Sequence, residues 1–218
     1  MLNGMEPVVE LLGVTRRYGT RRGGVLALRE VSLAVPQGSF VAVMGATGSG
    51  KSTLLHCAAG LDRPSAGTVR LGGRTITGMR EGALTRLRRQ RVGFIFQAYN
   101  LLSELTVRQN VLLPCRLGGP RPVNIDELLA AVGLAGLGHR PVAELSGGQR
   151  QRVAVARALV TNPVVIFADE PTGALDPTTG GQILGLLRAS VDRQGVSVVM
   201  VTHDPAAAAS SDRLVWPA

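Results

Sequence analysis

The chain has 218 residues, 45% of them hydrophobic, which suits one globular domain with a core built mainly from aliphatic side chains. Its formal net charge of +9 favours an anionic partner such as a membrane surface. Its arginine clusters lack the interleaved aromatic residues of a single-strand binder, so no nucleic-acid partner is expected. We find no apolar run long enough to span a bilayer, no secretory signal, and only two distant cysteines, features that predict a cytosolic location.

Short strands separated by turns dominate the first 97 residues. We expect strands at 7–14, 25–28, 31–35, 39–44, 68–71 and 92–96, with Gly and Pro in several of the turns between them. Helices are expected at 54–59 and in the basic segment 83–91. This half of the chain therefore predicts one phosphate-binding unit beside a small antiparallel sheet.

Helical spacing replaces the strand pattern between residue 101 and about residue 145, which we interpret as a small helical subdomain inserted into an α/β core. The segments expected to be helical in this region and just after it are 107–113, 125–132 and 150–160. Strands then alternate with helices again, with strands at 164–168, 196–201 and 214–216 and helices at 180–190 and from Pro205. Such alternation predicts a mostly parallel sheet covered on both faces.

A nine-residue stretch fits the P-loop pattern of Gly, four residues and Gly-Lys-Ser/Thr. An expected strand precedes it and an expected helix follows, a context that a plain glycine-rich turn does not need. Its backbone N–H groups and the helix N-terminus would cradle phosphates, Lys51 would reach the β- and γ-phosphates, and Ser52 would ligate Mg²⁺. Lys51 is also the only lysine among the 24 basic residues. The stretch consists of Gly45, Ala46, Thr47, Gly48, Ser49, Gly50, Lys51, Ser52 and Thr53.

Two acidic residues, Asp169 and Glu170, follow the apolar strand expected at 164–168. Ligand sites of open α/β sheets lie at the carboxyl ends of the strands, beside a P-loop. Asp169 would hold Mg²⁺ directly or through water, and Glu170 would lie near an attacking water as general base. The alternative is an acidic turn without a chemical role, which the P-loop upstream disfavours.

The segment Leu145-Ser146-Gly147-Gly148-Gln149 predicts a second anion-binding helix start. Ser146 suits an N-cap, and the two glycines expose backbone N–H groups at the positive end of the helix. One nucleotide does not obviously need two such devices. We therefore expect a dimer in which Ser146, Gly147, Gly148 and Gln149 of one subunit contact the nucleotide that the other subunit holds.

Three further residues are candidates on weaker grounds. His203 follows the strand expected at 196–201, near the place of a γ-phosphate, although it would also suit an ordinary loop histidine. Gln97 ends the strand expected at 92–96, where it could ligate Mg²⁺ or orient water. Tyr18 lies in an expected turn beside basic residues, and its ring is either a platform for adenine or a surface aromatic.

In their order along the chain, these motifs resemble the ATPase subunit of an ABC transporter, and the Leu-Ser-Gly-Gly-Gln signature is highly specific to that superfamily. The resemblance covers essentially the whole sequence and implies ATP and Mg²⁺ as ligands. It assigns Tyr18 to adenine stacking and places Asp176, in Ala174-Leu175-Asp176, in the D-loop. For catalysis it implies Lys51, Gln97, Glu170 and His203. For metal binding it implies Ser52, Gln97 and Asp169.

The fold implied by this resemblance is an α/β P-loop NTPase core, a mostly parallel sheet flanked by helices, with an antiparallel β subdomain and an inserted α-helical subdomain. Core and β subdomain would span 1–97 and 162–218, and the helical subdomain with the signature would span 98–161. Segments 60–64, 94–102 and 169–176 look like the macrolide-exporter and lipoprotein-release group of the family.

That group pairs its ATPase with a permease bearing a large extracytoplasmic domain. The resemblance therefore implies ATP hydrolysis coupled to transmembrane export, a second ATPase subunit in a homodimer, and a separate integral membrane permease. The chain would lie peripherally on the cytoplasmic face of the inner membrane. A permease complex that signals or controls envelope processes without transport is an open alternative. A chromosome-maintenance ATPase is disfavoured, because no heptad-bearing insertion separates Lys51 from Ser146.

Overall fold

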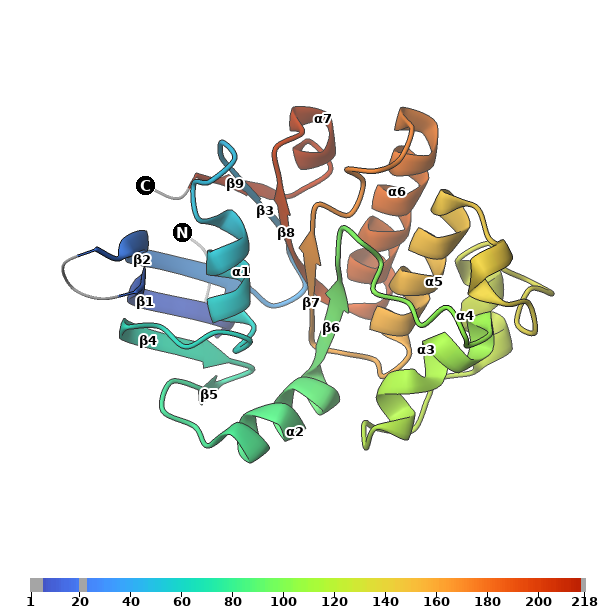
Figure 1. The fold of residues 1–218 in the computed structure, drawn as a ribbon, viewed down its shortest axis with the longest axis horizontal. Coiled ribbons are helices and arrows are strands. Elements are labelled where there is room, and N and C mark those ends of the chain that lie inside the picture. Colours follow the sequence, from blue (N-terminus) through green and yellow to red (C-terminus); the bar gives the residue numbers. More distant parts are fainter. Residues whose placement is uncertain (1–5, 20–22, 217–218) are drawn as a thin grey trace.

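The computed structural model describes residues 6–19 and 23–216. Its centre is a five-stranded parallel sheet in the order β6-β7-β8-β3-β9 (Figure 1). Strands β3 and β8 are buried along their whole length, as expected for strands covered on both faces; β3 is wholly apolar, and β8 is apolar between Ser197 and Thr202 at its ends. The strands are β3 (Phe40–Met44), β6 (Val92–Ile95), β7 (Val165–Asp169), β8 (Ser197–Thr202) and β9 (Arg213–Val215).

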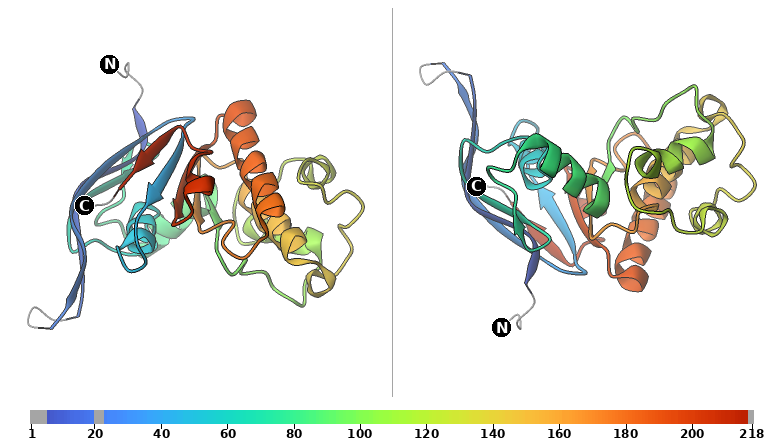
Figure 2. Two further views of the ribbon diagram at one scale, coloured as in Figure 1. Left: turned by 90° about the horizontal axis from the view of Figure 1, so that it is seen from above. Right: turned by 90° about the horizontal axis from the view of Figure 1, so that it is seen from below.

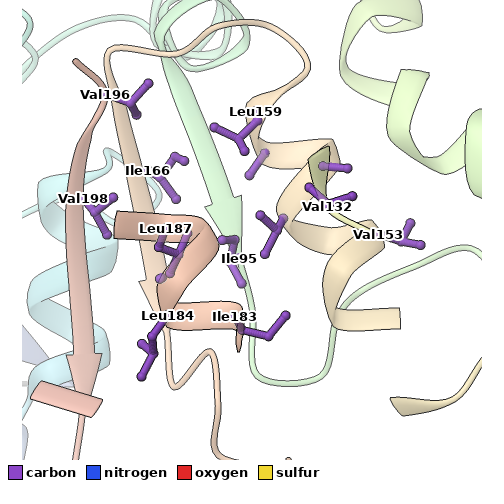
Figure 3. Close-up of a cluster of buried hydrophobic side chains, with 14 of the residues drawn as sticks. Ile95, Val132, Val153, Leu159, Ile166, Ile183, Leu184, Leu187, Val196 and Val198 are labelled. Atoms are coloured by element: carbon purple, nitrogen blue, oxygen red, sulfur yellow. The ribbon is translucent and has the colours of Figure 1, made fainter. Parts of the chain in front are cut away.

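Alternate side chains of this sheet enter two separate cores, because successive residues of a strand point to opposite faces. On one face, Ile166 and Val198 belong to a cluster with Leu187 of α6 and Leu159 of α5 (Figure 3). On the other face, the neighbouring Val165 belongs to the cluster that contains helix α1 and the second sheet. The helices named are α1 (Lys51–Ala58), α5 (Gly147–Leu159) and α6 (Pro177–Gln194).

The second sheet is antiparallel and has the order β2-β1-β4-β5. Its first two strands are longer than expected: β1 extends to Tyr18, and the segments expected as two strands form one. Several register shifts and a positive φ of 47° at Glu30 let this long ribbon continue where the sequence suggested a break. The strands are β1 (Pro7–Tyr18), β2 (Val25–Pro36), β4 (Ala66–Leu71) and β5 (Arg74–Thr75), of which β5 was not expected.

Helices α3, α4 and α5 gather at the end of the molecule opposite the antiparallel sheet (Figures 1 and 2). Thr106 is the N-cap of α3 and Ser146 is the N-cap of α5, and each forms a capping box. In this motif the N-cap hydroxyl accepts from the backbone N–H of a glutamine three residues later, and the glutamine side chain accepts from the N-cap N–H. Within the described residues, no helix combines the length and apolar character needed to cross a bilayer. The remaining helical elements are α2 (Glu81–Arg91), α3 (Val107–Arg116), α4 (Ile125–Ala131), the 3-10 turn η1 (Val142–Glu144) and α7 (Pro205–Ala208).

Candidate functional site

The P-loop connects β3 to α1 and needs glycine at two positions for different reasons. Gly48 has a φ of 81° and Gly50 a φ of 86°, both in the left-handed region. At Gly50 a side chain would also clash with the backbone, because a Cβ there would lie 2.2 Å from the carbonyl oxygen of Ala27. The loop therefore lies directly against β2, and Gly50 forms the N-cap from which α1 presents its free N–H groups.

Lys51 is the first residue of α1 and is 8% exposed. Its Nζ donates to the carbonyl oxygens of Gly45 and Ala46 at 2.7 and 2.8 Å. These bonds fold the side chain back over the loop, so that the ammonium group is held where the loop would carry phosphate charge. An ammonium group with backbone partners can exchange them for phosphate oxygens without leaving its position.

The acidic end of β7 lies next to the start of α1. The Ser52 hydroxyl donates to Asp169 Oδ1 at 3.2 Å, although 117 residues separate the two. Partial burial raises the pKa of Asp169, although the hydrogen bond from Ser52 acts in the opposite direction and lowers it. Two oxygen ligands of an octahedral Mg²⁺ at about 2.1 Å are about 3.0 Å apart, so this pair fits adjacent ligand positions.

Glu170 adopts a positive φ of 46°, a conformation that a non-glycine residue keeps only when its surroundings hold it. Its N–H donates to the Val201 carbonyl at 3.0 Å, and its Oε2 accepts from the Thr202 hydroxyl at 3.2 Å. The other oxygen, Oε1, lies 2.8 Å from His203 Nδ1. The Glu170 side chain is 14% exposed and that of His203 63%, so the carboxylate is sheltered and the imidazole faces solvent.

A cavity of about 460 Å³ joins these parts, a size suited to a small-molecule ligand. The structure thus brings together most of the P-loop, Asp169, Glu170, His203 and Gln97, which is exposed two residues after β6. The cavity is lined by Val25, Leu26, Ala27, Thr47, Gly48, Gly50, Lys51, Ser52, Thr53, Gln97, Asp169, Glu170 and His203.

Tyr18 lies beside this cavity, at the end of β1 rather than in a turn, and pairs with the cavity-lining Val25 across the sheet. Its ring is covered on one face by the Arg16 guanidinium, 4.3 Å from the ring centroid. Its hydroxyl donates to Asp62 Oδ2 at 2.6 Å, and Arg16 bonds the same carboxylate through Nε and Nη2. These contacts fix the orientation of the Tyr18 ring.

Asp62 is a residue that the sequence analysis missed, since a lone acid in a Gly-Pro turn carries no signal. Burial opposes its ionisation, but hydrogen bonds from the Tyr18 hydroxyl and the Arg63 N–H, together with the charge of Arg16, outweigh that effect and lower the pKa of Asp62. Thr202 was missed as well, although a hydroxyl at a strand end beside His203 is a signal that could have found it.

The signature segment does not line the cavity of its own chain among the described residues. Ser146 caps α5, accepting from the Gln149 N–H at 3.3 Å, while Gln149 Oε1 accepts from the Ser146 N–H at 3.1 Å. Gly148 packs on α6, where a Cβ would lie 2.6 Å from Thr179 Cγ2. Asp176 caps α6 by accepting from the Thr179 N–H, and the Thr179 side chain together with this N–H lowers the pKa of Asp176.

The family model described as ABC transporter matches residues 28–173 of the chain. Curated relatives include the macrolide export ATP-binding/permease protein MacB 1/2 of Paracoccus denitrificans, 48% identical over 96% of this chain and 32% of that protein. MacB of Salmonella typhimurium is 44% identical over 97% of this chain and 33% of its own length. The chain thus spans about a third of the length of these relatives.

Solved structures with the same fold include the dimeric structure of MJ0796, described as a bacterial ABC transporter cassette. It superimposes with a TM-score of 0.87 at 38% identity, covering 96% of this chain and 94% of that one. A post-hydrolysis state of the same cassette, bound to ADP and Pi, matches with the same values. These likenesses confirm the predicted α/β fold of the P-loop NTPase class.

Proposed function

The chain belongs to the ABC transporter family, and from that premise we propose that it is an ATPase that dimerises around two ATP molecules and drives a membrane permease. One observation carries the proposal: the P-loop, the Ser52–Asp169 pair and the sheltered Glu170 carboxylate meet in one cavity. This arrangement places phosphate-binding groups, oxygen ligands for a metal and a proton acceptor around one volume.

ATP binds with its phosphates on the P-loop N–H groups and Lys51. Ser52 and Asp169, with Gln97 nearby, would hold Mg²⁺, which would supply neutralisation of phosphate charge. Tyr18 stacks on adenine with the ring face that Arg16 leaves uncovered, and the Asp62 carboxylate keeps the ring in place. This assignment explains why Arg16 and Asp62 hold the exposed Tyr18 ring in a fixed orientation beside the cavity.

Glu170 accepts a proton from the water that attacks the γ-phosphate. Thr202 contacts one oxygen of the Glu170 carboxylate and His203 contacts the other, so both oxygens are held in place. The exposed His203 imidazole can also contact the γ-phosphate. A base fixed in this manner loses little conformational freedom when the nucleotide binds. Such positioning is the main contribution that a protein makes to phosphoryl transfer.

The dimer supplies the missing half of the site. The signature glycines and Ser146 form an anion-binding helix start that lies outside the nucleotide cavity formed by the described residues of its own chain. We assign residues 146–149, together with Asp176 at the start of the adjacent helix α6, to the nucleotide of a second copy. The dimeric state described for the MJ0796 cassette supports this assignment.

The permease docks in a second cavity, of about 290 Å³, between α2, β6, α3 and α5. Its floor contains Phe94, Phe96 and Leu113, and Arg89 is exposed at its edge. An apolar floor with a basic edge on a chain of net charge +9 fits an amphipathic cytoplasmic segment with acidic residues. In the MacB relatives, ATP-binding and permease parts share one name, which supports a permease partner on the inner membrane, either separate or joined.

Replacing Glu170 with glutamine tests the proposal. The amide keeps both contacts, since its oxygen accepts from Thr202 and its NH₂ can donate to His203 Nδ1, while the proton acceptor is lost. We expect ATP binding to persist, turnover to fall by about 10²- to 10⁴-fold, and an ATP-bound dimer to accumulate.

Phosphate release and size-exclusion chromatography with Mg-ATP measure these changes. Unchanged turnover would remove Glu170 from the role of base. A monomer that binds ATP tightly but never associates would contradict the shared site. The variant Thr202→Val, which keeps the carboxylate but removes one of its contacts, is a control expected to lose much less activity.

A further inference from the structure

Gln151 is a buried polar residue for which the proposed mechanism has no use. It lies in the second turn of α5, five residues after the N-cap Ser146, and is 1% exposed. Its Nε2 donates to the carbonyl oxygen of Pro171 at 2.6 Å, while its Oε1 has no hydrogen-bond partner among the described residues. A buried amide with one unpaired end is a poor choice for stability, because an apolar side chain would fill the same space without that cost.

The residue that Gln151 contacts is the one directly after Glu170. Around that point the backbone follows an unusual course: Glu170 has a positive φ, its N–H is bonded to Val201, and its carbonyl accepts from Gly173 at 3.1 Å. These bonds come from the sheet and from the turn itself. The bond from Gln151 is different, since it reaches the turn from α5 and holds the carbonyl of Pro171, the residue that follows Glu170.

We propose that Gln151 is a positioning residue for Glu170, which fixes the turn that carries the base against the helix that carries the signature. The proposal rests on the proposed function, since it presumes that Glu170 is the base. Helix α5 begins with residues 146–149, so the same rigid element presents the signature to a second subunit and holds the Glu170 turn of its own. Closing the dimer on ATP and placing the base then become one movement.

The substitution Gln151→Leu separates this role from a structural one. Leucine removes the hydrogen bond to Pro171 and also removes the unpaired oxygen, so the melting temperature should stay within a few degrees of the wild type. Loss of the bond lets the Glu170 turn relax, and misplacing a catalytic group by about 1 Å costs on the order of 10²-fold in rate. We therefore expect kcat to fall by about 10- to 100-fold with the KM for ATP unchanged.

A double variant provides the sharper readout. If Gln151 acts through Glu170, then adding Gln151→Leu to Glu170→Gln should lower the residual turnover no further, because the group being positioned is already gone. ATP-driven dimerisation of the double variant should equal that of Glu170→Gln alone. The matched control is Arg152→Met, which breaks the α5 contacts to Val132 and Gln182 but touches nothing in the turn, and should keep the wild-type kcat.

The outcomes separate the two proposals when the full 218-residue chain is assayed. Wild-type chain that binds ATP but releases phosphate no faster than Glu170→Gln would count against the proposed function itself. Active wild type together with a Gln151→Leu variant of equal kcat would overturn the positioning role. A fall in kcat that is matched by a large fall in melting temperature, or that recurs in the Glu170→Gln background, would also overturn it in favour of a structural role.

Discussion

Replacing Gly50 with alanine would test how closely the P-loop lies against β2. Alanine at a φ of 86° costs about 1–2 kcal/mol for the left-handed conformation alone. The new Cβ would also lie 2.2 Å from the Ala27 carbonyl oxygen and 3.2 Å from Leu28 Cδ2, so the loop must move by roughly 1 Å. Such overpacking adds about 1–3 kcal/mol, for a total destabilisation of about 2–5 kcal/mol.

Gly48→Ala is a matched control, because Gly48 has nearly the same φ of 81° but nothing within 4 Å of its added Cβ. It should cost only the conformational part, about 1–2 kcal/mol. At about 2–4 °C per kcal/mol for a chain of this length, thermal unfolding of the nucleotide-free protein should show a drop of about 4–20 °C for Gly50→Ala and about 2–8 °C for Gly48→Ala. Equal melting temperatures for the two variants would refute the close contact with β2.

Three further changes probe the site. Asp62→Asn should weaken ATP binding by about 3- to 10-fold in calorimetry but leave binding of inorganic tripolyphosphate unchanged, since only ATP has a base for Tyr18 to stack on. Because folding lowers the pKa of Asp62, the wild type should lose the stabilisation from this carboxylate as the pH falls below about 4, and the variant should not. Asp169→Asn should raise the melting temperature without nucleotide at neutral pH, because a carboxylate whose pKa is raised by folding destabilises the fold wherever it is ionised, and should abolish the Mg²⁺ dependence of ATP binding. Ser146→Arg should abolish phosphate release while fluorescent-nucleotide titration still shows ATP binding to the monomer; loss of monomer binding would mean that the signature serves its own subunit.

The parts of the site that the sequence predicted share a simple geometry. Asp169 ends a strand of the parallel sheet, while the P-loop, Glu170 and His203 each follow one, and the carboxyl ends of parallel strands meet at one edge. Strand assignment was therefore enough to bring residues more than 100 positions apart into one cavity. The buried strands β3 and β8 were equally predictable, since their largely apolar runs suit a sheet covered on both faces.

The parts that the sequence could not predict depend on how helices and their turns lie beside the two sheets. Tyr18 meets Asp62 across 44 residues, and Gln151 meets Pro171 across 20. Asp62 lies in the turn after α1 and faces the end of β1, and Gln151 of α5 faces the turn after β7, so each contact depends on how a helix is oriented beside its sheet. Hydrophobic periodicity fixes the buried face of a helix but not that orientation. The continuous β2 was missed for a related reason: a positive φ at Glu30 lets the strand continue through a polar pair.

The position of Lys51 gives this protein an unusual chemical property. Lys51 carries the single ε-amine of the chain, and that amine donates to two carbonyl oxygens of its own loop. Biosynthetic incorporation of ¹⁵N-ε-lysine would therefore label one side chain of the protein without changing its N–H donors, and would add one lysine resonance to an NMR spectrum. Its chemical shift would report directly whether the loop is closed on its own ammonium group or has exchanged those carbonyls for an anion.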